Sequence, residues 1–252
     1  MSDRPHVLVI AGTDSSGGAG LVRDVQVITE LGARASCVVT AVTAQTNDRV
    51  AVACVLSPEL VSQQLRTALQ SNNIGAVKIG MLGNGAIVRA VLEALPEQAQ
   101  IPVVVDPVLC SSSGAALLDP DGMKLLRERL LPRCTLVTPN LIEAGALLGQ
   151  HVARNSVEQT EQAQALLRFG SQGVLLKGGH GIGSESVDVL VTRNLAPILL
   201  KAQRLDVTMR GTGCALSSAI AALMAAGEEM SSACQRGKAS VHDKLLALLS
   251  HG

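Results

Sequence analysis

The chain has 252 residues, and its 21 basic and 21 acidic side chains balance. This balance excludes a strong overall attraction to nucleic acid or an anionic membrane, and the lack of Tyr and Trp leaves no aromatic platform for stacking bases. With 47% hydrophobic residues but no apolar run of 18, we expect a large core, no membrane span and, after a short polar N-terminus, no secretory signal.

Short β-branched runs alternate with longer helical patterns along the chain. The predicted strands are 7–11, 36–41, 76–79, 103–106, 136–138 and 174–177, followed by an edge hairpin of 187–192 and 197–205. The predicted helices are 19–31, 58–70, 86–95, 122–131, 141–148, 158–169 and the alanine-rich 215–226. Continuous apolar strands separated by amphipathic helices predict an α/β protein, a three-layer α/β/α sandwich around a mostly parallel sheet. The unbroken alternation favours a single domain over residues 1–252.

The six cysteines lack the paired spacing of a zinc site, and several lie within apolar runs. This pattern is typical of a reduced protein and not of a disulfide framework. We therefore expect a cytoplasmic location.

Two glycine-rich segments each lead into a predicted helix. Residues 12–20 (GTDSSGGAG) follow the first strand, and residues 211–214 (GTGC) precede the helix 215–226. Glycines let the backbone approach a ligand, while the first helical turn offers free N–H groups and the positive end of its dipole. The pair suggests one ligand that is held at its acceptor end and attacked at its phosphate end.

Most of the polar residues that could do chemistry follow the ends of predicted strands. Ligands of open parallel sheets bind outside the C-terminal ends of the strands, so this placement indicates a common site. The residues concerned are Thr13, Asp14, Gln45, Lys78, Asp106, Asn140 and the run 177–180.

Cys214 lies at a predicted helix N-terminus, where the pKa of a thiol is lowered. As a thiolate it could take the proton from a hydroxyl during phosphoryl transfer. The alternative is a small residue packed beneath the turn, and the sequence leaves both interpretations open.

Asn140 and Glu143, three residues apart at a helix start, together with Asp106 could hold a magnesium ion through water and phosphate. The alternatives are an N-cap with a capping box for the first two and a turn residue before Pro for Asp106.

Four further polar residues have a binding interpretation and a structural one. Lys177 could reach a phosphate or simply end a strand, and His180 is a turn residue rather than a catalyst. Asp24 and Gln45 could bind a polar heterocycle, with a solvated surface position as the alternative for each.

Taken together, these segments resemble the ribokinase-like superfamily and, more closely, its hydroxymethylpyrimidine/phosphomethylpyrimidine kinases. The resemblance extends from about Val7 to about Leu246. The matching segments occur in the family's order and are 11–20 with Asp24, 40–45, 78–82, 106–109, 138–143, 177–180 and 211–214.

The resemblance implies a homodimeric kinase of thiamine biosynthesis that uses ATP and Mg²⁺. It would phosphorylate 4-amino-5-hydroxymethyl-2-methylpyrimidine and then convert the monophosphate to the diphosphate. By the same resemblance, Gly211, Thr212 and Gly213 form the anion hole and Cys214 is the catalytic base. The implied pyrimidine-binding residues are Gly12, Ala19, Asp24, Gln45, Met81 and Val108. The implied ATP-binding residues are Asn140, Lys177, Thr212 and Lys238, and the implied metal ligands are Asp106 and Glu143.

The chain departs from the family pattern at three places. Arg210 stands before residues 211–214, where relatives commonly have a His. It could bind a nucleotide phosphate, or it could have no role in binding. Ser112 stands where relatives commonly have a lysine, which weakens the case for an efficient second phosphorylation. The sequence stops at Gly252, where relatives often continue into a glycine- and histidine-containing tail, so we expect part of the lid to be missing.

Two other functions stay open. The first is a pyridoxal kinase, in which the thiol of Cys110 could add to an aldehyde. The second is a non-catalytic pyrimidine-binding protein of the same fold. The serine at position 112, where relatives commonly have a lysine, favours this alternative. A sugar kinase is disfavoured because residues 13–18 lack the carboxylate-rich pattern that sugar hydroxyls require.

Overall fold

The computed structural model describes residues 4–46, 49–95, 101–111, 114–179, 183–193 and 195–250. Within these residues, nine strands form one sheet in the order β3-β2-β1-β4-β5-β6-β7-β8-β9. The strands are β1 (His6–Asp14), β2 (Arg34–Gln45), β3 (Val50–Val55), β4 (Ala76–Ile79), β5 (Val103–Val105), β6 (Leu136–Val137), β7 (Gly173–Leu176), β8 (Glu185–Thr192) and β9 (Leu195–Gln203). Neighbours from β2 to β7 run parallel, whereas β3, β8 and β9 pair antiparallel with their neighbours.

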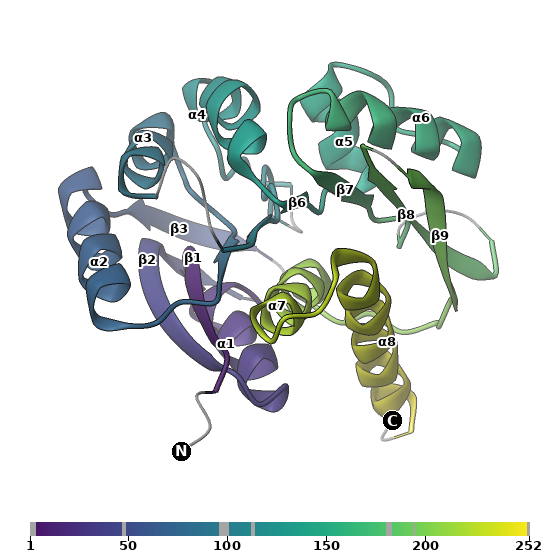
Figure 1. Cartoon of the computed structure of the whole chain (residues 1–252), viewed down its shortest axis with the longest axis horizontal. Helices are drawn as coiled ribbons and strands as arrows, with labels where there is room; N and C mark the ends of the chain where they lie inside the picture. Colours follow the sequence, from purple (N-terminus) through teal and green to yellow (C-terminus); the bar gives the residue numbers. More distant parts are fainter. Residues whose placement is uncertain are drawn as a thin grey trace.

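Helices cover both faces of this sheet (Figure 1). One face carries α2 (Pro58–Ser71), α3 (Gly85–Ala94), α4 (Pro120–Leu125), α5 (Leu141–Leu148) and α6 (Ser156–Leu167). The other face carries α1 (Gly20–Glu30), α7 (Thr212–Ala225) and α8 (Met230–Leu249). The expected α/β/α sandwich and its mostly parallel sheet are confirmed.

The first strand shows how the two layers of the core arise. Leu8 and Ile10 belong to the apolar cluster shared with α2–α6, while Val7 and Val9 belong to the cluster shared with α1, α7 and α8. Side chains of a strand point alternately to opposite faces, so the apolar middle of β1, residues 7–11, supplies both cores at once.

Three elements differ from the prediction. α8 is absent from the predicted helices. β3 is absent from the predicted strands, because its residues are all exposed or half-buried and show no alternation of buried and exposed positions. The predicted helix 122–131 changes pitch: α4 is followed by a turn of π-helix, Leu126–Leu130, and a turn of 3₁₀-helix, Leu131–Arg133. Pro132 cannot donate an N–H group, which ends the regular helix there.

α7 lies at the centre of the lower layer and contacts α1, α8, β1, β4 and β5 (Figure 1). Every residue from Ala215 to Met224 is buried. The helix ends as expected near Gly227, which has a φ of +90° and donates its N–H to Met224 O at 2.9 Å.

A fully buried ion pair joins three of these elements. Lys78 Nζ of β4 lies 2.8 Å from both carboxylate oxygens of Asp24 on α1, and both side chains have 0% exposure. Ser218 of α7 donates its hydroxyl to Asp24 Oδ1 at 2.8 Å. Each polar group of this cluster thus has a partner, as burial requires.

We expect Asp24→Ala to lower the free energy of unfolding by about 3–5 kcal/mol, because it leaves the Lys78 ammonium buried without a countercharge. Urea denaturation followed by circular dichroism measures this change. Glu185→Ala is the control, since it removes a half-exposed ion pair with Lys201 and should change the stability by about 1 kcal/mol or less. Equal effects of the two substitutions would contradict the prediction.

Candidate active site

The two glycine-rich turns, far apart in the sequence, are in direct contact. Gly211 caps α7 with a φ of +71°, and a Cβ atom there would lie only 2.4 Å from Gly18 O. Gly20 begins α1 with a φ of +59°, and a Cβ there would lie 2.4 Å from Gly12 O. Side chains at either position are excluded both by this approach and by the backbone conformation. The structure therefore brings together residues 12–20, the predicted acceptor loop, and residues 211–214, the predicted phosphate turn.

The first turn of α7 provides the expected anion-binding groups. Ala215 N donates to Gly211 O at 2.8 Å, so it is the first N–H of the helix with a helical acceptor. The N–H groups of Thr212, Gly213 and Cys214 precede it and meet the positive end of the helix dipole. Such a turn binds phosphate through the backbone, whatever its side chains are.

Cys214 lies where the N-termini of α1 and α7 converge. Burial raises the pKa of its thiol to about 11, and the charges of Asp24 and Asp106 act in the same direction. The Lys78 ammonium and a hydrogen bond from the Gly20 N–H oppose this rise without overcoming it. The expectation of a lowered pKa is therefore wrong for this structure, because desolvation outweighs the helix terminus.

A second group of charges lies beside Gly213. Lys177 Nζ donates to Asp106 Oδ1 at 2.7 Å. A Cβ atom at Gly213 would lie 3.0 Å from Lys177 Nζ and 3.3 Å from Asp106 Oδ2. The phosphate turn thus passes directly over this ion pair, and a glycine fits there best.

Asn140 and Glu143 form the capping box that was one of their two interpretations. Asn140 Oδ1 accepts from Glu143 N at 2.9 Å, and Glu143 Oε2 accepts from Asn140 N at 2.7 Å. Burial raises the pKa of Glu143 to about 7, opposed by the charge of Lys177 and aided by that of Asp106. These electrostatic effects place Glu143 in the same cluster as the Lys177–Asp106 pair.

The predicted metal ligands fit a magnesium ion held mainly by water and phosphate. Asp106 and Glu143 share the neighbourhood of Lys177 and the phosphate turn. Among the described residues, no group of three or more His, Cys, Asp or Glu side chains could hold a metal. Two carboxylates with open positions suit Mg²⁺, which retains several waters and binds substrate phosphates.

On the acceptor side, Gly12 lies against Met81, and Gln45 lies against the loop that follows β1. A Cβ atom at Gly12 would lie 2.9 Å from Met81 Sδ, and Thr40 Oγ1 donates to Met81 O at 2.6 Å. Gln45 N donates to Ser15 Oγ at 2.9 Å, which joins the end of β2 to the acceptor loop.

The remaining predicted acceptor residues are placed differently. Ala19 touches the phosphate turn, since its Cα would lie 3.1 Å from a Cβ at Gly211. Val108 is half-buried shortly after β5. Asp24 has neither of its predicted positions: it is not on the surface, and both its carboxylate oxygens face Lys78 in the core.

Lys238 of α8 is held by a carboxylate. Its Nζ lies 2.8 Å from Asp188 Oδ2, while Asp188 Oδ1 accepts from Gly178 N at 2.8 Å. Through Asp188, Lys238 therefore helps to fix the position of the segment that follows Lys177.

Three further residues singled out from the sequence lie apart from these contacts or cannot be placed. Ser112 and His180 lie outside the described residues, and Cys110 is exposed.

Sequence reasoning noted Lys78 only as a polar residue at a strand end and missed its buried partnership with Asp24. The signal was a lysine within the otherwise apolar strand Ala76–Ile79, which requires a buried countercharge. Asp188 was missed because it lies within a hairpin strand and resembles an ordinary surface residue in sequence.

The fold and the paired glycine turns define the class of protein: a ribokinase-like phosphotransferase. The model of the phosphomethylpyrimidine kinase family matches residues 14–252, so the chain belongs to this family. The hydroxymethylpyrimidine/phosphomethylpyrimidine kinase of Rhizobium meliloti (strain 1021) is 39% identical over 241 residues, 95% of this chain and 90% of the relative. That of Escherichia coli (strain K12) is 42% identical over 220 residues, 87% of this chain and 83% of the relative.

Two solved structures extend the comparison. Phosphomethylpyrimidine kinase from Clostridium difficile 630 superposes with a TM-score of 0.82 at 32% identity, covering 96% of this chain and 99% of the other. Pyridoxal kinase from Staphylococcus aureus in complex with AMP-PCP and pyridoxal superposes with a TM-score of 0.87 at 28% identity, covering 96% and 88%. The resemblance inferred from the sequence is confirmed, and with it the assignment as a kinase.

The raised pKa of Cys214 predicts how its alkylation by iodoacetamide depends on pH. Below a pKa of about 11 the thiolate fraction grows about tenfold per pH unit, so the rate should still be rising at about pH 10. Peptide mass spectrometry resolves Cys214 from the exposed cysteines. The same residue in urea is the control and should level off above an ordinary thiol pKa of about 8.5. A plateau below about pH 9 in the folded protein would contradict the assigned direction.

Proposed function

We propose that this kinase uses MgATP to phosphorylate 4-amino-5-hydroxymethyl-2-methylpyrimidine and then converts the monophosphate to the diphosphate, the two pyrimidine steps of thiamine biosynthesis. The observation that carries the proposal is the backbone contact between the acceptor loop at Gly18 and the phosphate turn at Gly211. This contact supports a site in which an acceptor hydroxyl and a donor phosphate lie next to each other. Family membership supplies the substrate class.

The phosphate turn supports transfer without covalent chemistry by the protein. The N–H groups from Thr212 to Cys214 and the α7 dipole stabilise the charge that spreads over the transferring phosphoryl group. Lys177 adds a positive charge beside Gly213. A bound Mg²⁺, held by Asp106 and Glu143, would neutralise phosphate oxygens.

Lys177 and Asp106 are paired with each other in the structure. When the metal is bound, Asp106 would hold it together with Glu143, and Lys177 would place its positive charge beside a phosphate. Burial opposes the charged form of Lys177, but the nearby charges of Asp106 and Glu143 outweigh it and raise the pKa of this lysine. Lys177 therefore stays positively charged for a phosphate ligand.

In our proposal Cys214 accepts the proton of the acceptor hydroxyl. With a pKa of about 11, the thiolate is a minor species at neutral pH, and the nearby Lys78 ammonium limits the cost of forming it. Deprotonation of the hydroxyl is late in a loose phosphoryl-transfer transition state, so a base is needed only as the new bond forms.

A pyridoxal kinase is the second candidate, favoured by a specific observation. The Staphylococcus aureus pyridoxal kinase, whose structure contains pyridoxal, superposes on 96% of this chain with a TM-score of 0.87. An exposed cysteine, Cys110, lies in the segment after β5. Sequence identity is lower than to the pyrimidine kinases above, which places this candidate second.

The function is tested by an ATP-consumption assay with Mg²⁺ on hydroxymethylpyrimidine, its monophosphate and pyridoxal, with products resolved by mass. We expect both pyrimidine phosphates to form. Monophosphate alone would limit the enzyme to the first step, in line with the serine at position 112. Turnover of pyridoxal alone would establish the second candidate, and binding without any product would establish a non-catalytic binding protein.

Cys214→Ala should lower kcat by about 10²-fold or more, the scale of a lost general base, with the binding of ATP and pyrimidine nearly unchanged. Cys234→Ala is a matched control, because it makes the same change at a buried cysteine of α8. Unaltered turnover of the Cys214 variant would show that this thiol only packs beneath the turn.

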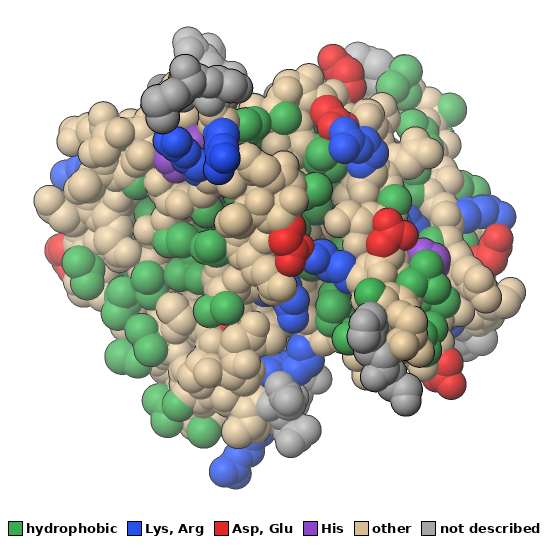
Figure 2. Space-filling view, turned by 90° about the horizontal axis from the view of Figure 1, so that it is seen from below, with side chains coloured by type: hydrophobic (Ala, Val, Ile, Leu, Met, Phe, Trp, Pro, Cys, Tyr) green, Lys and Arg blue, Asp and Glu red, His purple; other side chains and the backbone are tan. Residues whose placement is uncertain are grey.

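We also propose a homodimer that assembles through the β2–β3 edge. Val42 and Val52 are 49% and 59% exposed, and Ala51, Ala53 and Cys54 of β3 are exposed as well. Hydrophobic side chains gather on the side of the molecule where Figure 1 places β2 and β3 (Figure 2). An exposed apolar edge strand is normally covered by another element or by a partner chain.

Sedimentation of the wild-type protein should give twice the monomer mass, and Val52→Asp should give monomers. A wild-type monomer would refute the dimer.

One continuous sheet supports our proposal that the chain is one domain. None of the helices among the described residues is long and apolar enough to cross a membrane. We further propose a cytoplasmic location, since exposed thiols such as Cys37 and Cys110 persist in a reducing compartment. Recovery of the native protein from another compartment on fractionation would contradict it.

A further inference from the structure

Arg210 immediately precedes the phosphate turn, yet its side chain reaches the acceptor loop 194 residues away in sequence. Nη1 donates to Ser16 Oγ at 2.8 Å and to Thr46 O at 3.0 Å. Nη2 lies 3.3 Å from Asp14 Oδ2. One guanidinium group thus contacts the loop after β1 and the residue that follows β2.

The backbone at Gly18 packs closely against Arg210. A Cβ atom at Gly18 would lie 3.3 Å from Nη1 and 3.4 Å from Cβ of Arg210. The neighbouring Gly211 packs on the carbonyl of the same Gly18. The arginine therefore belongs to the phosphate turn through its backbone and to the acceptor loop through its side chain.

The charged partner of Arg210 is itself fixed in place. Asp14 is 4% exposed, and its Oδ1 accepts from Ser16 N at 2.8 Å and from Ser16 Oγ at 2.7 Å. Burial pushes the pKa of Asp14 up, but hydrogen bonds from Ser16 and Gln45 and the charge of Arg210 together outweigh it and lower the pKa. The carboxylate is ionised at neutral pH and holds the guanidinium.

We propose that Arg210 is a positioning residue that sets the separation between the acceptor loop and the phosphate turn. This inference rests on the proposed phosphoryl transfer between ligands at these two turns. In-line transfer depends on the distance and angle between hydroxyl and phosphorus, and a misplacement of about 1 Å costs about 10²-fold in rate. The contacts assign Arg210 to the acceptor side, not to the nucleotide phosphate that the sequence suggested.

The chemistry of the side chain explains why an arginine is suited to this position. Its planar guanidinium offers donors in several directions at once, so it can bridge Asp14, Ser16 and the carbonyl of Thr46. A lysine keeps the charge but concentrates its donors at one point. Arg210→Lys should therefore retain the attraction to Asp14 and lose the bridge.

Steady-state kinetics of Arg210→Met, Arg210→Lys and Asp14→Asn separate positioning from binding. We expect Arg210→Met to lower kcat by about 10²-fold, with the KM for ATP changed by about twofold or less. Arg210→Lys should remain impaired by about tenfold. Combining Arg210→Met with Asp14→Asn should add little to the first substitution, because the guanidinium that Asp14 holds is already lost. Full additivity of the two effects, or a loss confined to the KM for ATP, would overturn the proposal.

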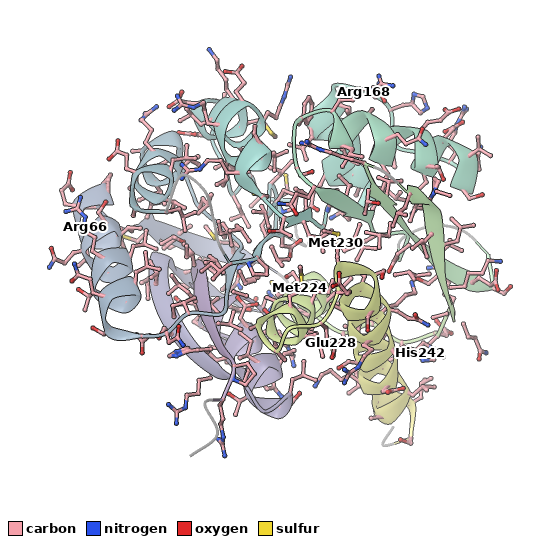
Figure 3. All side chains as sticks on the ribbon, viewed as in Figure 1. Arg66, Arg168, Met224, Glu228, Met230 and His242 are labelled. Atoms are coloured by element: carbon pink, nitrogen blue, oxygen red, sulfur yellow. The ribbon has the colours of Figure 1, made fainter. Side chains whose placement is uncertain are left out.

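Arg236→Met is the matched control. Arg236 of α8 pairs with Glu228, which follows the C-terminal end of α7, whereas the phosphate turn lies at its N-terminal end. Figure 3 labels Glu228 beside α7 and α8. This variant should keep wild-type kinetics, and thermal unfolding should show that all variants are folded.

A readout without turnover makes the inference independent of the proposed function. Amide hydrogen exchange of peptides covering residues 12–20 should be about tenfold faster in Arg210→Met and unchanged in Arg236→Met. Unchanged exchange in Arg210→Met would overturn the positioning role whatever the kinetics. If the wild-type protein transferred phosphate to no acceptor, the proposed function would fail while the exchange result still decided whether Arg210 orders this loop.

Discussion

The fold of the site depends on the buried ion pair between Lys78 and Asp24. An isolated ammonium in the core would be prohibitive, so β4 and α1 are bound to the one arrangement in which the charges meet. Ser218 extends the constraint to α7, and it lies one helical turn after Cys214. The start of α7, and with it the phosphate turn, is therefore located by a contact buried beneath the ligand-binding surface.

Three cations near the candidate active site are each paired with a carboxylate. Lys177 is paired with Asp106, Arg210 with Asp14 and Lys238 with Asp188. Each cation is held in place by a carboxylate, so the site is organised before any phosphate arrives, and charge is not left unbalanced in partly buried surroundings.

The layers and the two glycine turns were predictable from the sequence because both follow from local chemistry. A continuous apolar run such as Val103–Val105 indicates a strand buried on both faces, and glycines before a helical pattern indicate a backbone turn. β3 escaped prediction because neither face is buried, which removes the alternation that marks a strand. The positions of Asp24 and Lys238 and the pKa of Cys214 also escaped, since each depends on partners distant in sequence.

The central position of α7 has a consequence for how the protein is made. This helix is buried from Ala215 to Met224, yet it begins only at Thr212 of a chain of 252 residues. During synthesis, β1, β4 and β5 can pair, but the face of the sheet that α7 covers stays uncovered until the helix has left the ribosome. Contacts between the two ends of a chain form slowly, and exposed apolar strands aggregate in the meantime. The helix that carries the phosphate turn is thus also the element whose late synthesis decides how long the apolar face of the sheet stays exposed.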